Sequence, residues 1–162
     1  MSKFKNSVKD LVDLRKPVKT IKGKLSLIGL ALILELIYYT LAGLIRGFGV
    51  SKPIIDSFFF IAVILASIYE SIIFWGLLYM LLRLLAWLQF LKINLLWIFI
   101  IVIGLFFGYK HLGTPGNTFA IAIFVKSFSG ILYGWLVVKT QNLWSIIIAH
   151  MLWNAAVIIF FV

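Results

Sequence analysis

The sequence contains no cysteine and very few acidic side chains. Without cysteine it can form no disulfide, no thiolate zinc site and no catalytic thiolate. The 162 residues include only five Asp and Glu and two His, and charged residues make up 12% of the chain. Soluble proteins have roughly 25% charged residues, so an ordinary soluble domain is excluded. Any site chemistry must therefore come from Glu, His and Asn side chains.

Apolar residues dominate instead, at 64% of the chain, and 17% of the residues are aromatic. Several uninterrupted apolar runs approach or exceed the roughly 18 to 20 residues that a helix needs to cross a bilayer. We therefore predict an all-α fold, a polytopic transmembrane helical bundle with five or six crossings.

The second apolar region, residues 54–92, leaves the number of crossings open. As one straight helix its ~38 residues would reach ~57 Å, nearly twice the hydrocarbon thickness. It must tilt, kink or leave the membrane, and Gly76 and Arg83 mark where that could begin. A separate crossing by residues 77–91 would make six. The other crossings are expected at about 25–45, 94–111, 119–138 and 143–162.

Residues 1–24 form a basic segment, and residues 25–162 form the predicted transmembrane domain. The net charge is +10, and more than half of the 15 Lys and Arg residues precede the first apolar run. Next to that run, the basic segment favours an anionic cytoplasmic leaflet over nucleic acid as its partner. By the positive-inside rule the N-terminus is cytoplasmic, in a multi-pass protein of the cell membrane. The run exceeds the ~7 to 15 residues of a signal-peptide core, which indicates a permanent anchor.

Polar side chains inside the apolar runs are candidate site residues, because a central charge costs about 2.5 to 3.5 kcal/mol on insertion scales. His150 and Asn154 are four residues apart, so they share one helix face. They could act on one ligand, or they could only join helices by hydrogen bonds. Glu70 could be a general base, a proton relay, a metal ligand or a carboxyl group satisfied by a neighbour.

Two further charged positions and one histidine complete this set. Glu35 on the first crossing could pair with Arg83 or Lys126, which would neutralise a buried charge. His111 stands at the end of its apolar run, where an interfacial histidine is equally expected. Alternation of the crossings puts His111 near the outer end of its span, away from Glu70. The chain must then break within residues 54–92, or re-enter the membrane after His111 with Lys126 lining an aqueous cavity.

Three short motifs follow one another along the chain. They are Glu70 with Phe74-Trp75-Gly76, then Phe107-Gly108-Tyr109-Lys110-His111, and last His150-Met151-Leu152-Trp153-Asn154. Together they resemble the CPBP family of CAAX prenyl proteases and Abi bacteriocin-processing or bacteriocin-immunity proteins, which carries Glu-Glu-x-x-x-Arg, Phe-x-x-x-His and His-x-x-x-Asn on successive transmembrane helices. The likeness covers Glu70 to Asn154, within a CPBP/Abi-like core of about 54–162.

The resemblance implies catalytic roles for Glu70, His111, His150 and Asn154. Glu70 would activate a water as general base, and the histidines would orient it or bind a metal such as zinc. Asn154, with one of the histidines, would stabilise the developing oxyanion. A zinc mechanism and a metal-free glutamate mechanism both stay open.

The first motif departs from the family pattern at two positions. Ser71 stands where the family has its second Glu, and Trp75 stands where the family has Arg. The two replaced groups have opposite charges, so losing both leaves the buried charge balance unchanged, whereas losing one would strand a charge. The pattern indicates that a supporting ion pair has been removed.

The predicted function is that of an intramembrane endopeptidase acting on a peptide or membrane-protein substrate, in a bacterium. One alternative is a non-catalytic or weakly catalytic protein of the same fold that confers bacteriocin immunity or modulates a membrane sensor. Another is a small transporter or proton channel that uses Glu35, Glu70 and Lys126 as a relay.

Overall fold

The computed structural model describes residues 10, 13–14, 16–46, 57–87, 93–112, 119 and 121–161. These residues form α-helices and short π-helical segments and no strand, which confirms the all-helical prediction. In chain order the elements are α2 (Ile21–Arg46), α3 (Ser57–Glu70), η1 (Ser71–Gly76), α4 (Leu77–Trp87), α5 (Ile93–Lys110), η2 (Ile121–Lys126), α6 (Ser127–Thr140) and α7 (Leu143–Phe161).

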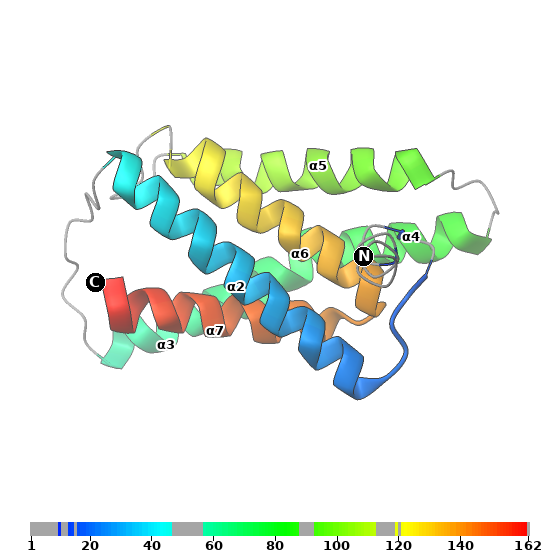
Figure 1. Cartoon of the computed structure of the whole chain (residues 1–162), viewed down its shortest axis with the longest axis horizontal. Helices are drawn as coiled ribbons and strands as arrows, with labels where there is room; N and C mark the ends of the chain where they lie inside the picture. The colour runs from blue at the N-terminus through cyan, green and yellow to red at the C-terminus, as the bar shows by residue number, and fades with distance from the viewer. Residues whose placement is uncertain are drawn as a thin grey trace, which may run out of the picture.

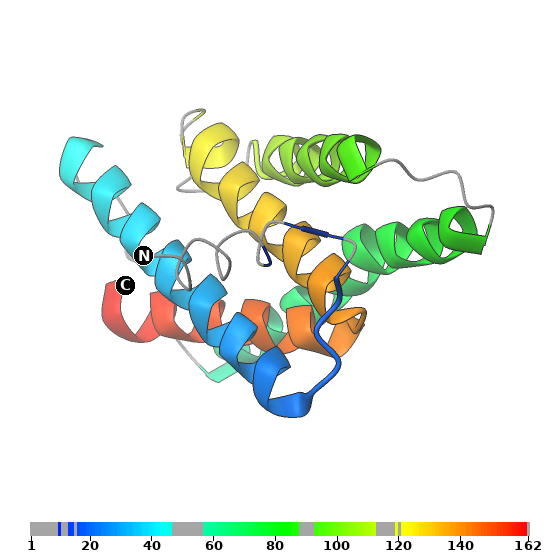
Figure 2. The same cartoon turned by 45° about the vertical axis from the view of Figure 1, so that its right-hand side comes forward.

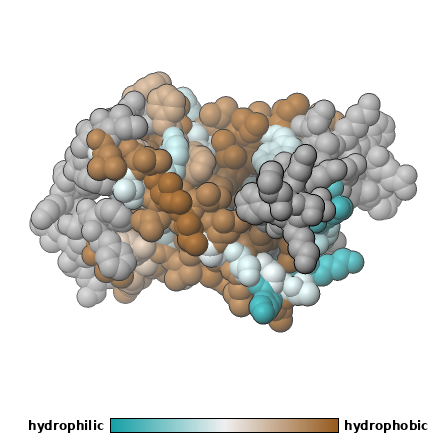
Figure 3. All heavy atoms as spheres, viewed as in Figure 1, coloured by the Kyte–Doolittle hydropathy of each residue, from teal (hydrophilic) through white to brown (hydrophobic). Residues whose placement is uncertain are grey.

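The helices are suited to a lipid environment. By length and composition, the stretches Ile21–Leu44, Phe60–Leu81 and Ile121–Thr140 could each cross a membrane, and Leu95–Lys110 and Leu143–Ile159 are shorter apolar helices. Large apolar side chains cover the outward faces, and Figure 3 shows one broad apolar face. The hydrophilic surface in that view gathers at the end of the molecule where α2 begins. This distribution is that of a membrane protein rather than a soluble bundle.

Residues 57–87 of the long second apolar region form one continuous helix, and the hydrogen-bond pattern changes within it. Helices α3 and α4 are joined without interruption by η1, a π-helical segment that begins directly after Glu70 and ends at Gly76. The irregularity expected near Gly76 is therefore present, and residues Leu77–Trp87 continue the same helix. Single π-helical turns inside α-helices are rare and occur frequently at functional sites.

The helices pack in two crossing directions around a shared core. Figure 1 shows α2 running alongside α6 and crossing α7 diagonally, with α5 along one edge of the bundle beside α6 and α3 beside α7. The turned view in Figure 2 keeps α2 on the outside of α6 and α7. The core between them combines aliphatic and aromatic side chains and includes the buried residues Trp75, Phe107, Tyr133, Leu136 and Ile146.

Helices α5 and α6 approach each other closely because glycines line their contact. A Cβ atom added to Gly104 would lie 2.7 Å from the backbone nitrogen of Ile131, and one added to Gly130 would lie 2.8 Å from Cα of Gly104. A Cβ atom on Gly108 would overlap Ser127 Oγ. Small residues spaced by four let membrane helices pack backbone against backbone. This contact fixes the end of α5, where His111 follows.

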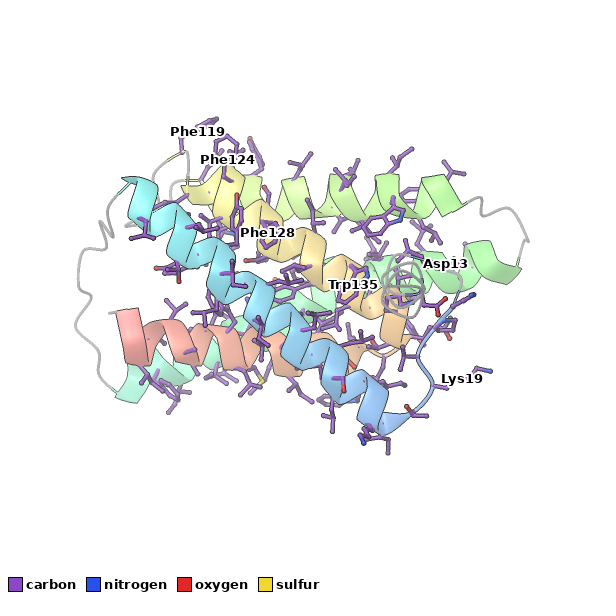
Figure 4. All side chains as sticks on the ribbon, in the orientation of Figure 1. Asp13, Lys19, Phe119, Phe124, Phe128 and Trp135 are labelled. Carbon is purple, nitrogen blue, oxygen red and sulfur yellow. The ribbon has the colours of Figure 1, made fainter. Side chains whose placement is uncertain are left out.

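The segment before α2 is held against the end of α6 by a buried lysine. Nζ of Lys139 donates hydrogen bonds to the backbone carbonyls of Asp10 (2.7 Å), Asp13 (3.1 Å) and Lys16 (2.7 Å). The Val18 amide donates to the Lys139 carbonyl at 2.7 Å. Figure 4 shows Asp13 beside this end of the bundle. The ammonium of Lys139 is thus satisfied while its side chain is only 2% exposed.

Candidate active site

Two histidines from different helices face one carboxylate. Glu70 ends α3, His111 follows the last residue of α5, and His150 lies in α7. The Nε2 atoms of His111 and His150 lie 3.8 and 3.7 Å from the two carboxylate oxygens of Glu70. These distances exceed a direct hydrogen bond and are in the range that a bridging water can span. Alternation of the crossings placed Glu70 and His111 at different depths in the membrane, but the structure brings their side chains together.

The second ring nitrogen of each histidine is held by a partner of its own. Nδ1 of His111 lies 2.8 Å from the Phe107 carbonyl, and Nδ1 of His150 lies 3.3 Å from the Ser71 hydroxyl. A carbonyl can only accept, so Nδ1 of a neutral His111 carries the proton and Nε2 presents a lone pair toward Glu70. Each imidazole is therefore oriented by a partner at Nδ1 while its Nε2 atom faces Glu70, as is common for ligand-binding or catalytic histidines.

Asn154 lies one turn beyond His150 on the same face of α7, as the four-residue spacing predicts. Its Nδ2 atom donates to the Ser67 hydroxyl at 2.8 Å, and that hydroxyl donates to the Val63 carbonyl at 2.8 Å. Ser67 is on α3, three residues before Glu70, and is fully buried. Ser67 is not among the site residues expected from the sequence. The one feature of the sequence that could have indicated it is the three-residue spacing from Glu70, which puts two polar side chains on one helix face.

Ser71 and Trp75 both contact the wall of the site that His150 forms. Trp75 is fully buried, and its indole N–H donates to the Gly130 carbonyl at 3.3 Å. The Trp75 ring lies edge-on to His150, with ring centroids 6.1 Å apart, and 4.9 Å from the ring of Phe107. Apolar and hydrogen-bonded contacts thus occupy the two positions where the CPBP pattern has Glu and Arg.

Glu35 and Lys126 lie near the same group of residues. Both Glu35 oxygens accept from the Tyr133 hydroxyl, at 3.0 and 3.1 Å, and Lys126 interacts electrostatically with both Glu35 and Glu70. Of the two pairings expected for Glu35, the interaction with Lys126 is present, whereas the side chain of Arg83 lies outside the described residues. Tyr133 was missed because nothing in the sequence relates it to Glu35.

The metal site predicted at His111 and His150 would need at least one further ligand. Among the described residues, no group of three or more His, Asp or Glu side chains is arranged to hold a metal ion. The histidine nitrogens instead converge on the Glu70 carboxylate. Zinc binding stays a prediction.

Comparison with known proteins identifies the family of the chain. The family model described as type II CAAX prenyl endopeptidase Rce1-like matches residues 54–156, well over half of the chain and all four candidate residues. No curated protein and no solved structure matches. The chain therefore belongs to the Rce1-like family of type II CAAX prenyl endopeptidases.

Proposed function

We propose that the chain hydrolyses a peptide bond in a peptide or membrane-protein substrate, with Glu70 as general base. The observation that carries this proposal is the pair of Nε2 atoms, from His111 and His150, at 3.8 and 3.7 Å from the Glu70 carboxylate. Membership of an endopeptidase family supports the same reaction class.

In the proposed reaction a water bound between Glu70 and the histidines attacks the scissile carbonyl carbon. Glu70 accepts one proton of the water as the new C–O bond forms, and the Nε2 lone pair of neutral His111 accepts a hydrogen bond from the other O–H of the water. His150 lies at the other carboxylate oxygen of Glu70. The carbonyl oxygen becomes an oxyanion that accepts a hydrogen bond from Asn154. As the tetrahedral intermediate collapses, the C–N bond breaks and the protonated Glu70 returns its proton to the leaving amine.

The experiment is cleavage of membrane-protein and peptide substrates by the purified protein in liposomes, with new N-termini identified by mass spectrometry. We expect Glu70→Gln and His150→Ala to lose cleavage by at least about 100-fold, the usual contribution of a general base. Tyr69→Phe is the matched control, because its side chain points outward next to Glu70 and should leave the rate unchanged. Cleavage that is indifferent to both site changes would refute the proposal.

Ser71 and Trp75 favour one second candidate, a protein of the same fold that binds a bacteriocin or a sensor without cleaving it. Its site lacks the ion pair of the CPBP pattern, and a non-catalytic protein needs no general base. Glu70→Gln would then retain protection of cells against the bacteriocin. A strain that becomes sensitive with Glu70→Gln would rule this candidate out.

The proposed setting is the cytoplasmic membrane of a bacterium, with residues 1–24 on the cytoplasmic face. Lys19 and Lys22, just before and inside the first turn of α2, have exposed side chains that could contact anionic headgroups. Lys19 extends from the end of the molecule where α2 begins (Figure 4).

A further inference from the structure

A second carboxylate, Glu35, is buried beside the candidate active site. Its side chain is 2% exposed, and an unpartnered carboxylate at that depth would be costly. Both oxygens accept from the single hydroxyl of Tyr133, at 3.0 and 3.1 Å. The carboxylate is on α2, whereas Tyr133 is on α6, so the bond joins the first helix to the centre of the bundle.

The other side of Tyr133 contacts a proposed catalytic histidine. The rings of Tyr133 and His150 are 5.0 Å apart and inclined by 40°, and Tyr133 is fully buried. Trp75 lies edge-on to Tyr133 with centroids 5.3 Å apart. The His150 ring is thus confined by Tyr133 and Trp75 and bonded by Ser71, so movement of Tyr133 would release one of its contacts.

Glu35 also balances the charge that faces Glu70. Lys126 interacts electrostatically with both carboxylates. Without Glu35, the ammonium of Lys126 would lose one of the two carboxylates that balance its charge and would act on Glu70 alone among these groups. Glu35 therefore acts on both partners of the 3.7 Å contact between Glu70 and His150.

We propose that Glu35 is a positioning residue for the reaction, which holds His150 through Tyr133 and leaves Glu70 free to face the histidines. The inference rests on the proposed function for its kinetic consequence. It extends the site beyond residues 54–156, because α2 precedes the part of the chain that the family model matches. In this role Glu35 is the second carboxylate of the site. It lies on α2, whereas Ser71, which stands where the CPBP pattern has its second Glu, begins η1.

The test compares Glu35→Gln and Tyr133→Phe with Leu36→Ala, a change of the neighbouring, outward-facing side chain on α2. We expect each of the first two to lower kcat roughly tenfold, the effect of losing about one hydrogen bond, with KM nearly unchanged. The double variant should be little worse than Tyr133→Phe alone, because Tyr133→Phe removes the donor of the same bond that Glu35→Gln weakens by taking away the charge of its acceptor. Leu36→Ala should behave as wild type.

A second readout does not depend on cleavage. The chain has only two histidines, so ring nitrogen NMR of protein labelled at histidine resolves His150 once His111→Gln has assigned the other signal. Glu35→Gln and Tyr133→Phe should shift the His150 resonances. The proposal is overturned if both variants keep the wild-type His150 resonances and the wild-type kcat. A lowered unfolding temperature in such variants would mean that Glu35 and Tyr133 only stabilise the fold.

The two readouts separate this proposal from the proposed function. If the wild-type protein cleaves nothing, the endopeptidase proposal fails, and the NMR shifts still decide whether Glu35 positions His150. If Glu35→Gln does not fold, Tyr133→Phe removes the same hydroxyl bond while keeping the ring and carries the test alone.

Discussion

The Oε2 atom of Glu70 and the Nε2 atom of His150 lie 3.7 Å apart, although α4, α5 and α6 lie between α3 and α7 along the chain. The contact is supported on both sides by hydroxyl groups of α3 and of η1, which continues it. Ser67 binds Asn154 and Ser71 faces His150, so one helix sets the positions of both polar residues of α7.

The replaced pair at Ser71 and Trp75 predicts a coupling between two substitutions. Ser71→Glu alone should lower the free energy of unfolding by about 3 kcal/mol or more, since it buries a carboxylate without a partner. Trp75→Arg alone strands a cation and loses aromatic packing. The double variant should be less destabilised than the sum of the singles by at least about 1 kcal/mol. Unfolding in detergent measures this, and strictly additive effects would contradict the ion-pair interpretation. Ser71→Ala is the uncharged control.

The hydrogen bond between Asn154 and Ser67 predicts graded losses of activity. Asn154→Ala should lower kcat by about 100-fold if its amide stabilises the oxyanion. Ser67→Ala keeps the amide but removes its anchor, so it should cost about tenfold or less. Leu152→Ala, an outward-facing change on the same helix, should leave kcat unaltered. Equal kcat in Asn154→Ala and wild type would exclude an oxyanion role.

The glycine contact between α5 and α6 predicts opposite outcomes for two similar changes. A methyl group at Gly104 would meet backbone atoms of Ile131, so Gly104→Ala should destabilise the protein by about 1 to 3 kcal/mol. At Gly29 on α2 nothing lies within 4 Å of an added Cβ. Gly29→Ala should therefore be neutral or stabilising by up to about 1 kcal/mol. Thermal unfolding in detergent distinguishes them, and equal tolerance would mean that α5 and α6 are not in backbone contact.

The bonds of Lys139 predict that this side chain protects the segment before α2. Lys139→Met keeps an apolar stem but removes three hydrogen bonds, each worth about 1.5 to 3 kcal/mol when the donor is charged. Trypsin should then cut after Lys19 roughly tenfold faster or more, because cleavage follows the population of the opened segment. Lys110→Met, at the exposed end of α5, is the matched control. An unchanged cleavage rate in Lys139→Met would show that Lys139 does not hold the segment.

Much of the fold was predictable because a bilayer demands long apolar helices. The polar residues Glu70, His150 and Asn154 stood out because their cost in an apolar run requires a reason. His111 had no such signal on its own and gained one only from the order of the motifs. The π-helical segment after Glu70 was anticipated only as an irregularity near Gly76, since nothing in the sequence sets which hydrogen bonds shift.

The sequence by itself determined the helices, the family pattern and the side chains that could do chemistry, because these depend on local composition and spacing. Only the tertiary structure decided that two histidines face one carboxylate, that Ser67 and Ser71 hold the residues of α7, and that Glu35 reaches Tyr133. These contacts join different helices. They depend on how far each helix is rotated and how closely glycines let it approach its neighbour, which spacing along the chain does not specify.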